Sequence, residues 1–254
     1  MRSQIYNQAK YYEIAFSFIN AKKQADLFEK FIRTYSRIKV RRILDIACGT
    51  ALQLRELAKR GHITIGLDVN SQMIRYLKKT SLAEKLDIEV VKADMNAFKL
   101  KKRVDFAYIM MGSIVYAKNN DLFLSHLKSV ASSLRSGGLY LIENIPIHWT
   151  DPTFFKKQTW ITKKEGVEIK TTYQILPKNP LKQEITQILK MEIKNNGIER
   201  EFIDKDDLKI IFPEEIKLLI EKNNEFEFLG FFHRNKVKLL KEISPNNILV
   251  LRKK

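Results

Sequence analysis

The segment Arg42-Ile43-Leu44-Asp45-Ile46-Ala47-Cys48-Gly49-Thr50-Ala51-Leu52-Gln53 is the most informative part of this chain for its fold. Its apolar run ends in the carboxylate of Asp45 and then turns through small residues. From Leu52 to Arg60, apolar and charged residues recur at helical spacing, and Gly61 follows as a candidate C-cap. The pattern predicts a buried strand, a tight turn and a helix N-terminus, which together form a nucleotide-binding turn.

Small residues in such a turn indicate that the backbone approaches a ligand closely, and Gly49 is the first candidate for that approach. The spacing Asp-x-Ala-x-Gly-x-Ala differs from the Gly-x-Gly-x-x-Gly of dinucleotide sites. The carboxylate of Asp45 would also repel a diphosphate. A dinucleotide oxidoreductase is therefore disfavoured, while a turn that holds no ligand stays open as an alternative.

Two further acids end predicted strands. Residues 62–68 end in Asp68, at roughly the 20-residue interval at which an acid meets ribose hydroxyls. Residues 87–94 end in Asp94, and Met95 follows it. This pair could accept a hydrogen bond from an exocyclic amine and pack on the face of a purine. Because the carboxyl ends of parallel strands meet at one edge of a sheet, we expect the three acids around one crevice.

These segments together resemble the class I S-adenosylmethionine-dependent methyltransferases. Residues 43–53, 64–73 and 91–95 match the first three motifs of that family, and residues 104–116 and 134–143 resemble its fourth and fifth strands. The resemblance covers about residues 5–145 and is nearest to small-molecule N-methyltransferases. It implies S-adenosyl-L-methionine as the methyl donor and S-adenosyl-L-homocysteine as the product. No metal site is expected, because the histidines show no metal-ligand spacing.

The resemblance also assigns site residues. The cofactor contacts that it implies are Asp45, Ala47, Cys48, Gly49, Asp68, Val69, Met73, Asp94, Met95 and Met110. The candidates on the substrate side are Tyr12, Ser113, Tyr116 and His148, with Met111 and Glu143 beside them. Tyr11-Tyr12-Glu13 resembles the Tyr-Tyr-Asp of an N-terminal helix that covers the active site, and His148 could act as a base. Each of these side chains could instead be a packing residue.

Two departures from the family pattern bear on function. Ala47 and Ala51 stand where the family usually has glycine, which predicts a more crowded turn and a lower cofactor affinity. The Asn/Asp-Pro-Pro-Tyr/Phe motif of many nucleic-acid base methyltransferases is missing, and Met111-Gly112-Ser113-Ile114 takes its place.

The composition bounds the class of protein. One cysteine excludes an intramolecular disulfide, and the four histidines show no metal-ligand spacing. The net charge of +17 is spread along the chain, with clusters at residues 37–42, 99–103 and 252–254. A solvated basic surface is the favoured interpretation, and contact with nucleic acid or with a negatively charged substrate stays open. The sequence contains no signal peptide and no apolar span of ~20 residues, so we expect a cytoplasmic monomer or homodimer without membrane contact.

The alternation of strands and helices from Arg42 to Glu143 predicts an α/β fold with a doubly wound, Rossmann-like, mostly parallel seven-stranded sheet. Two amphipathic helices, at residues 5–19 and 22–36, are expected to pack over the cofactor, so that residues 1–36 form a helical lid. A helix over residues 121–135 is expected to end in a turn at Gly137-Gly138.

The pattern changes after Asn144. Period-two alternation at residues 167–175, 189–193 and 198–203, with a turn at Lys178-Asn179-Pro180, predicts an inserted antiparallel β-sheet cap over residues 146–206. A helix is expected from Pro213 to Glu221. Strands at residues 225–232 and 247–251 then complete the main sheet, so the methyltransferase domain comprises residues 1–145 and 207–254.

The function that these expectations favour is methyl transfer to a small-molecule acceptor, at nitrogen, by in-line displacement with catalysis mainly by positioning. Two alternatives stay open. One is a methyltransferase that acts on RNA or protein. The other is a regulatory protein that binds S-adenosylmethionine without turnover.

Overall fold

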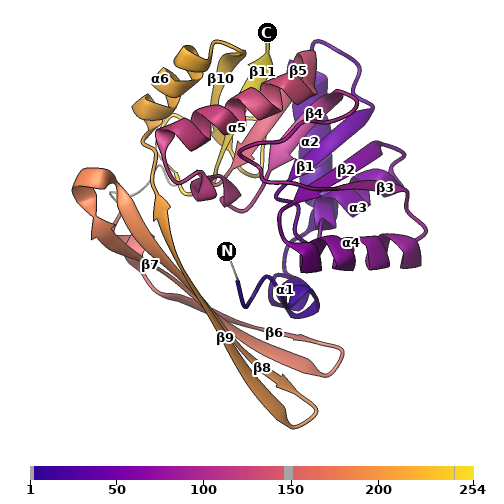
Figure 1. Cartoon of the computed structure of the whole chain (residues 1–254), viewed down its shortest axis with the longest axis vertical. Helices are drawn as coiled ribbons and strands as arrows, with labels where there is room; N and C mark the ends of the chain where they lie inside the picture. Colours follow the sequence, from indigo (N-terminus) through magenta and orange to yellow (C-terminus); the bar gives the residue numbers. More distant parts are fainter. Residues whose placement is uncertain (1–2, 146–150, 243) are drawn as a thin grey trace.

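The structure, a computed structural model, describes residues 3–145, 151–242 and 244–254, and it contains two separate sheets (Figure 1). The larger sheet has seven strands in the order β10-β11-β5-β4-β1-β2-β3, and the smaller one has four strands in the order β6-β7-β8-β9. The predicted α/β class, with a mostly parallel main sheet and an antiparallel second sheet, is confirmed.

The main sheet is built as the sequence predicts. Its strands are β1 (Arg42–Ile46), β2 (Ile63–Asp68), β3 (Ile88–Lys92), β4 (Val104–Ile109), β5 (Leu134–Glu143), β10 (Phe226–His233) and β11 (Asn247–Lys253). Strand β1 pairs in parallel with β2 on one side and with the central strand β4 on the other, and β11 lies antiparallel between β5 and β10. Both β1 and β4 are buried almost throughout, because helices cover both faces of the sheet.

Helices pack on the two faces of this sheet. On one face lie α2 (Ala21–Tyr35), α3 (Leu52–Lys59) and α4 (Ser71–Ala83), and on the other lie α5 (Asn120–Ser133) and α6 (Pro213–Asn223). Successive strand residues alternate between these two layers: Ile43 packs in the core of the first helices and Leu44 in that of the second. Pro213 is the first residue of α6, as expected for a helix start.

The first helix differs from its prediction. Instead of residues 5–19, α1 covers only Ala9–Ala15. The backbone after it forms tighter turns, in which the N–H of Ser17 donates to the carbonyl of Ile14. The side chain of Asn20 then caps α2 by accepting from the N–H of Lys23 at 2.9 Å. The second helix, expected at residues 22–36, is thus confirmed within one residue at each end.

The predicted turn at Gly137-Gly138 is also wrong. Helix α5 ends at Ser133 and β5 begins at Leu134, so both glycines lie within the strand, where its register against β4 shifts. A Cβ on Gly138 would lie 2.5 Å from the carbonyl oxygen of Asp105. Gly138 is therefore required by the close approach of two strands rather than by a turn.

The second sheet consists of β6 (Gln158–Lys164), β7 (Val167–Asn179), β8 (Glu184–Asn195) and β9 (Ile198–Lys209). Strand β6 was not expected, and the three expected strands are longer than predicted. The turn predicted at residues 178–180 leads into a 3₁₀ turn, η3 (Pro180–Lys182). Residues 165–166 and 196–197 have positive φ and join neighbouring strands as tight hairpins. The division of the chain into two domains stays a prediction.

The inner face of the second sheet packs on the N-terminal segment. Ile169 and Met191 join Ile14 and Phe16 in one apolar cluster. Trp160 Nε1 also donates to the carbonyl of Ala15 at 2.8 Å. The N-terminal segment therefore lies between the two sheets, as Figure 1 shows. None of the helices formed by the described residues has the length and apolarity needed to cross a bilayer.

Candidate functional site

The turn between β1 and α3 has an unusual backbone. Ala47, Gly49 and Ala51 all have positive φ, at 54°, 53° and 56°. For alanine this left-handed conformation costs roughly 1–2 kcal/mol, so tertiary contacts hold the two alanines there. A Cβ placed on Gly49 would meet no protein atom within 4 Å. Open space thus adjoins the backbone at Gly49, as required for close approach of a ligand.

Asp68, at the end of β2, holds this turn in place. One carboxylate oxygen accepts from the N–H of Gly49 at 2.8 Å, and the other accepts from the N–H of Asn70 at 2.7 Å. Burial raises the pKa of Asp68, and these N–H donors oppose that effect. The ends of the two adjacent strands are therefore joined at one edge of the sheet.

Asp45 lies at the end of β1 with only 2% of its surface exposed. Tyr108 Oη, from β4, donates to its carboxylate at 3.0 Å. Burial raises the pKa of Asp45 well above its usual range, an effect that the hydrogen bond from Tyr108 partly offsets. Burial likewise raises the pKa of the neighbouring Cys48 thiol, which favours a packing role for that residue.

A small pocket opens at this edge, with a volume of about 50 Å³. From the predicted site it brings together Asp45, Ala47, Cys48, Gly49, Met110, Ser113 and Tyr12. Phe16, Ile19 and Met111 complete much of the wall. Typical small-molecule sites have volumes of about 300–1,000 Å³. This pocket is smaller, and Tyr12, Phe16 and Ile19 of the N-terminal segment form part of its wall.

The other predicted cofactor residues do not line this pocket. Val69 is 64% exposed just after β2, and Met73 is buried in the first turn of α4. Asp94 is exposed, and one of its oxygens accepts from the N–H of Asn96 at 2.8 Å. Met95 is buried, and its carbonyl oxygen lies 2.8 Å from His126 Nδ1. The roles of these residues, like that of Asp68, stay predictions, and His148 lies outside the described residues.

Tyr116 lies toward the second sheet rather than in the pocket wall. It ends the 3₁₀ turn η1 (Ser113–Tyr116), and its hydroxyl donates to Asp206 Oδ2 at 3.1 Å. Gln187 Nε2 donates to the same hydroxyl at 3.3 Å, and Tyr6 Oη lies 3.1 Å from it. Asp206 is only 7% exposed, and burial raises its pKa.

This Tyr6–Tyr116–Gln187–Asp206 cluster was missed by sequence reasoning, apart from Tyr116. A partial signal was available in β9, where Asp206 shares the inward face of the strand with the buried Leu208. The pairing partner Gln187 on β8 becomes visible only from the register of the two strands.

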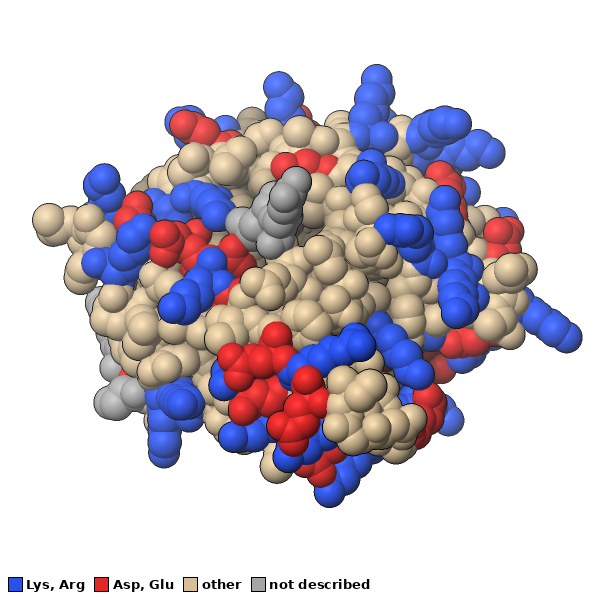
Figure 2. Space-filling view, turned by 60° about the horizontal axis from the view of Figure 1, so that its bottom comes forward, with Lys and Arg blue, Asp and Glu red and all other residues tan. Residues whose placement is uncertain are grey.

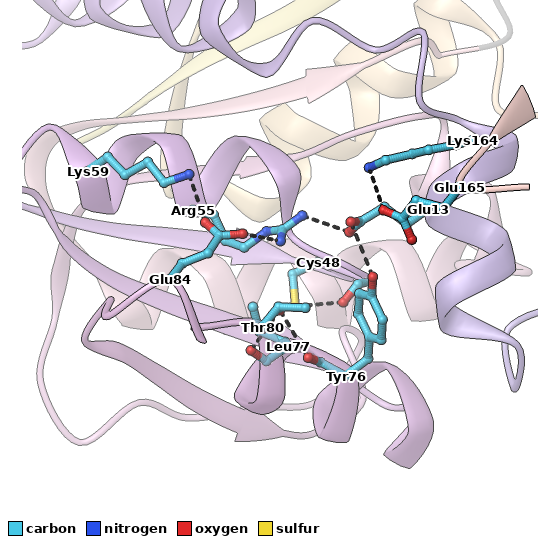
Figure 3. A network of polar contacts seen from close by, with 11 residues as sticks. Glu13, Cys48, Arg55, Lys59, Tyr76, Leu77, Thr80, Glu84, Lys164 and Glu165 are labelled. Carbon is cyan, nitrogen blue, oxygen red and sulfur yellow. Dashed lines mark hydrogen bonds and ion pairs between the residues drawn. The ribbon is translucent and has the colours of Figure 1, made fainter. Parts of the chain in front are cut away.

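A buried ion-pair network ties α1 to the main domain (Figure 3). Arg55 of α3 donates from one guanidinium nitrogen to Glu13 at 2.7 Å and from the other to Glu84 at 2.6 Å. Tyr76 Oη donates to Glu13 at 3.2 Å, and burial together with the Glu13 charge raises the pKa of Tyr76 to about 12. The Arg55 side chain is 8% exposed. The network holds in place the helix that carries Tyr12 into the pocket.

The surface charge is dispersed on the face seen in Figure 2. Lys and Arg side chains lie all around the outline of this face, and Asp and Glu side chains lie among them. The dispersed pattern agrees with a solvated basic surface on this side of the molecule.

Three comparisons connect this geometry with known proteins. Residues 43–138 match the family model described as "Methyltransferase domain". A curated relative, the dTDP-3-amino-3,4,6-trideoxy-alpha-D-glucopyranose N,N-dimethyltransferase of Streptomyces venezuelae, is 28% identical over 101 residues. The match covers 40% of this chain and 41% of that relative. The chain thus spans less than half the length of this relative.

Solved structures resemble the whole fold. An S-adenosylmethionine-dependent methyltransferase from Clostridium acetobutylicum has a TM-score of 0.79 at 14% identity, with 96% of both chains covered. The amino pentose methyltransferase CalS10 from Micromonospora echinaspora, solved with S-adenosylmethionine bound, has a TM-score of 0.73 at 16% identity, over 100% of this chain and 98% of that one. Residues 43–138 therefore match a methyltransferase domain, and the fold is that of solved S-adenosylmethionine-dependent methyltransferases. The family resemblance seen in the sequence is confirmed.

Proposed function

We propose that this protein is an S-adenosylmethionine-dependent N-methyltransferase whose acceptor is a small molecule carrying an amine, of the amino-sugar class. The observation that carries the proposal is the pocket at the carboxyl edge of the main sheet, with Gly49 beside open space and Tyr12 covering it. The relative from Streptomyces venezuelae and CalS10 are both named as methyltransferases of amino sugars, which supports this acceptor class.

The residues at the pocket fit a sulfonium nucleoside. Asp45 offers a buried carboxylate to the amino group of the cofactor, directly or through water, and the turn at Gly49 admits the ligand close to the backbone. Asp68 retains lone pairs for ribose hydroxyls beyond the two N–H groups that it already accepts. We assign the adenine end to Asp94 and Met95, and Val69, Met73, Cys48 and Met110 to the surrounding wall.

S-adenosylmethionine supplies an activated methyl group, so the protein has mainly to position the acceptor and exclude water. Tyr12, Phe16 and Ile19 cover the pocket from the N-terminal segment. Ser113 lies in its wall and can orient an amine or hydroxyl by hydrogen bonding. An ammonium acceptor must first lose a proton to water or to a nearby base, a role for which His148 remains a candidate.

The Tyr6–Tyr116–Gln187–Asp206 cluster supports an acceptor with a positive or hydrogen-bonding group. It is connected to the pocket through Tyr6, whose ring lies 5.5 Å from that of Tyr12 between centroids. A buried carboxylate is stabilised by a cation or by further donors. Asp206 is thus suited to hold an amine-bearing acceptor above the pocket.

Transfer of a labelled methyl group tests the proposal. The acceptors are a nucleotide-linked amino sugar, the matching sugar with a hydroxyl in place of the amine, a peptide with a free N-terminus, and RNA. Label in the amino sugar alone is expected. Asp206→Asn should then raise the KM for the acceptor and leave cofactor affinity unchanged. Label in the RNA or the peptide, with none in the amino sugar, would overturn the acceptor class.

A further inference from the structure

The edge of the main sheet opposite the pocket gathers basic side chains from three separate segments. Arg42 begins β1, Lys102 and Arg103 precede β4, and Arg135 lies near the start of β5. The strands are parallel, so their amino ends meet at one edge. The two basic clusters at residues 37–42 and 99–103, which the proposed reaction does not use, are thereby brought together.

These side chains line a hollow. Arg42, Lys102, Arg103, Arg135 and Ser136 surround a cavity of about 560 Å³, within the size range of small-molecule sites. Lys102, Arg103 and Arg135 are exposed, and Arg42 is half-buried. Because like charges that converge on one cavity repel one another, an anionic ligand would stabilise the arrangement.

The carboxylates nearby neutralise this charge poorly. Asp105 is buried, and one of its oxygens already accepts from the N–H groups of Arg41 and Arg42 at 2.9 Å each. Its other oxygen lies 3.4 Å from Arg135 Nη1. Glu89 lies 3.5 Å from Arg42 Nη2. Among the described residues, only these two long contacts therefore offset the four positive charges that line the hollow.

Arg42 also keeps an unused donor. Its Nε is buried and has no hydrogen-bond partner among the described residues. An unmade hydrogen bond at a buried donor costs about 1–3 kcal/mol. This nitrogen is closed to solvent, so a ligand in the hollow would pair with the terminal nitrogens of the arginines that line it.

From these observations we propose a second binding site at this edge, for the phosphate groups of a small polyphosphorylated anion. Arginine pairs with phosphate through two parallel hydrogen bonds, and three of the lining residues are arginines. The lining holds no aromatic side chain on which a nucleic-acid base could stack, and the site is concave rather than a flat ridge. Both features favour a compact anion over a nucleic-acid backbone.

Calorimetry with inorganic tripolyphosphate at about 0.15 M salt tests the proposal. The double variant Arg103→Gln/Arg135→Gln removes two cations from the hollow. Lys78→Gln/Lys79→Gln, two exposed residues of α4, removes the same charge elsewhere. We expect the Kd to rise by about tenfold or more in the first variant, as when a charge-assisted hydrogen bond is lost, and to stay unchanged in the second. If the double variant unfolds, Arg103→Gln alone is measured in its place.

A titration in the presence of S-adenosylhomocysteine tests whether the two sites are separate. Because the two sites lie at opposite edges of the sheet, saturation with S-adenosylhomocysteine should leave tripolyphosphate binding unchanged. Three results would overturn the proposal: no binding by the wild-type protein, an equal loss in both double variants, or displacement by S-adenosylhomocysteine. Binding of an RNA oligonucleotide without binding of tripolyphosphate would also overturn it, because the surface would then belong to a nucleic-acid partner.

Discussion

Asp68 accepts a hydrogen bond from the backbone N–H of Gly49 at 2.8 Å, which ties the end of β2 to the turn that follows β1. The two residues are separated by 18 others in the sequence, and the parallel pairing of β1 with β2 brings them together. The carboxylate of Asp68 thus has a structural partner in addition to the ribose that we assign to it.

Replacement of Asp68 separates these two roles. Asp68→Ala should weaken binding of S-adenosylhomocysteine by roughly 1.5–3 kcal/mol, as when a charge-assisted hydrogen bond is lost. Asp87→Ala, an exposed acid just before β3, serves as the control and should leave affinity unchanged. Calorimetry gives the affinities and thermal unfolding reports the structural loss. Unaltered affinity in Asp68→Ala would remove this residue from the site.

Glycine should stabilise the protein at the turn alanines, which have positive φ, although it destabilises a helix. Ala47→Gly relieves the strain of a positive φ and should raise the free energy of unfolding by about 0.5 kcal/mol. Ala58→Gly, within α3, should lower it by about 1 kcal/mol because glycine is unfavourable in a helix. Denaturant titration measures both. Equal destabilisation of the two variants would show that the turn at Ala47 is not strained.

The Glu13–Arg55 ion pair should control how often α1 leaves the pocket. Glu13→Gln removes the charge that Arg55 holds at 2.7 Å, and we expect cleavage of residues 3–20 by an added protease to become about tenfold faster. Lys10→Gln breaks an exposed pair of the same helix with Glu165 and should change the rate about twofold or less. The same rate in both variants would mean that the network in Figure 3 does not hold the helix.

His126 gives the fold a pH dependence. It is fully buried between the carbonyl of Met95 and Tyr140 Oη, and burial lowers its pKa from 6.5 to about 4. The unfolded chain binds this proton more tightly. The contribution of neutral His126 to the free energy of unfolding is therefore fully present above about pH 6.5 and is lost as the pH drops toward 4.

Between about pH 7 and pH 5, this residue should account for about 2 kcal/mol of lost stability. His126→Gln removes the titrating group, so its free energy of unfolding should fall by that much less over the same interval. Parallel losses in the wild type and the variant would assign the pH dependence to other groups.

The sequence predicted the main sheet well because local patterns determine it. The buried runs of β1 and β4 read directly as strands, and the small residues after Asp45 marked the turn. Contacts between segments that are distant in the sequence could not be predicted from local patterns. The pairing of Arg55 with Glu13 and of Tyr116 with Asp206 depends on how α1 and the second sheet pack on the domain.

Strand β6 was missed for a local reason. Its apolar residues do not all lie on one buried face of the strand, since Ile161 is exposed and Trp160 is only half-buried. The adenine-binding role of Asp94 was inferred from its position after a strand and stays a prediction; in the structure one of its carboxylate oxygens accepts from the N–H of Asn96. A carboxylate at a strand end and a local cap have the same sequence pattern.

The methyl-donor site itself is tested by calorimetric titration of the wild-type protein with S-adenosylhomocysteine and, separately, with NAD. One S-adenosylhomocysteine should bind per chain, and NAD should give no heat of binding. At 100 times its Kd the ligand should also stabilise the protein by about 2.7 kcal/mol. Binding of NAD in its place, or of neither ligand, would contradict a methyl-donor site at the carboxyl ends of β1 and β2.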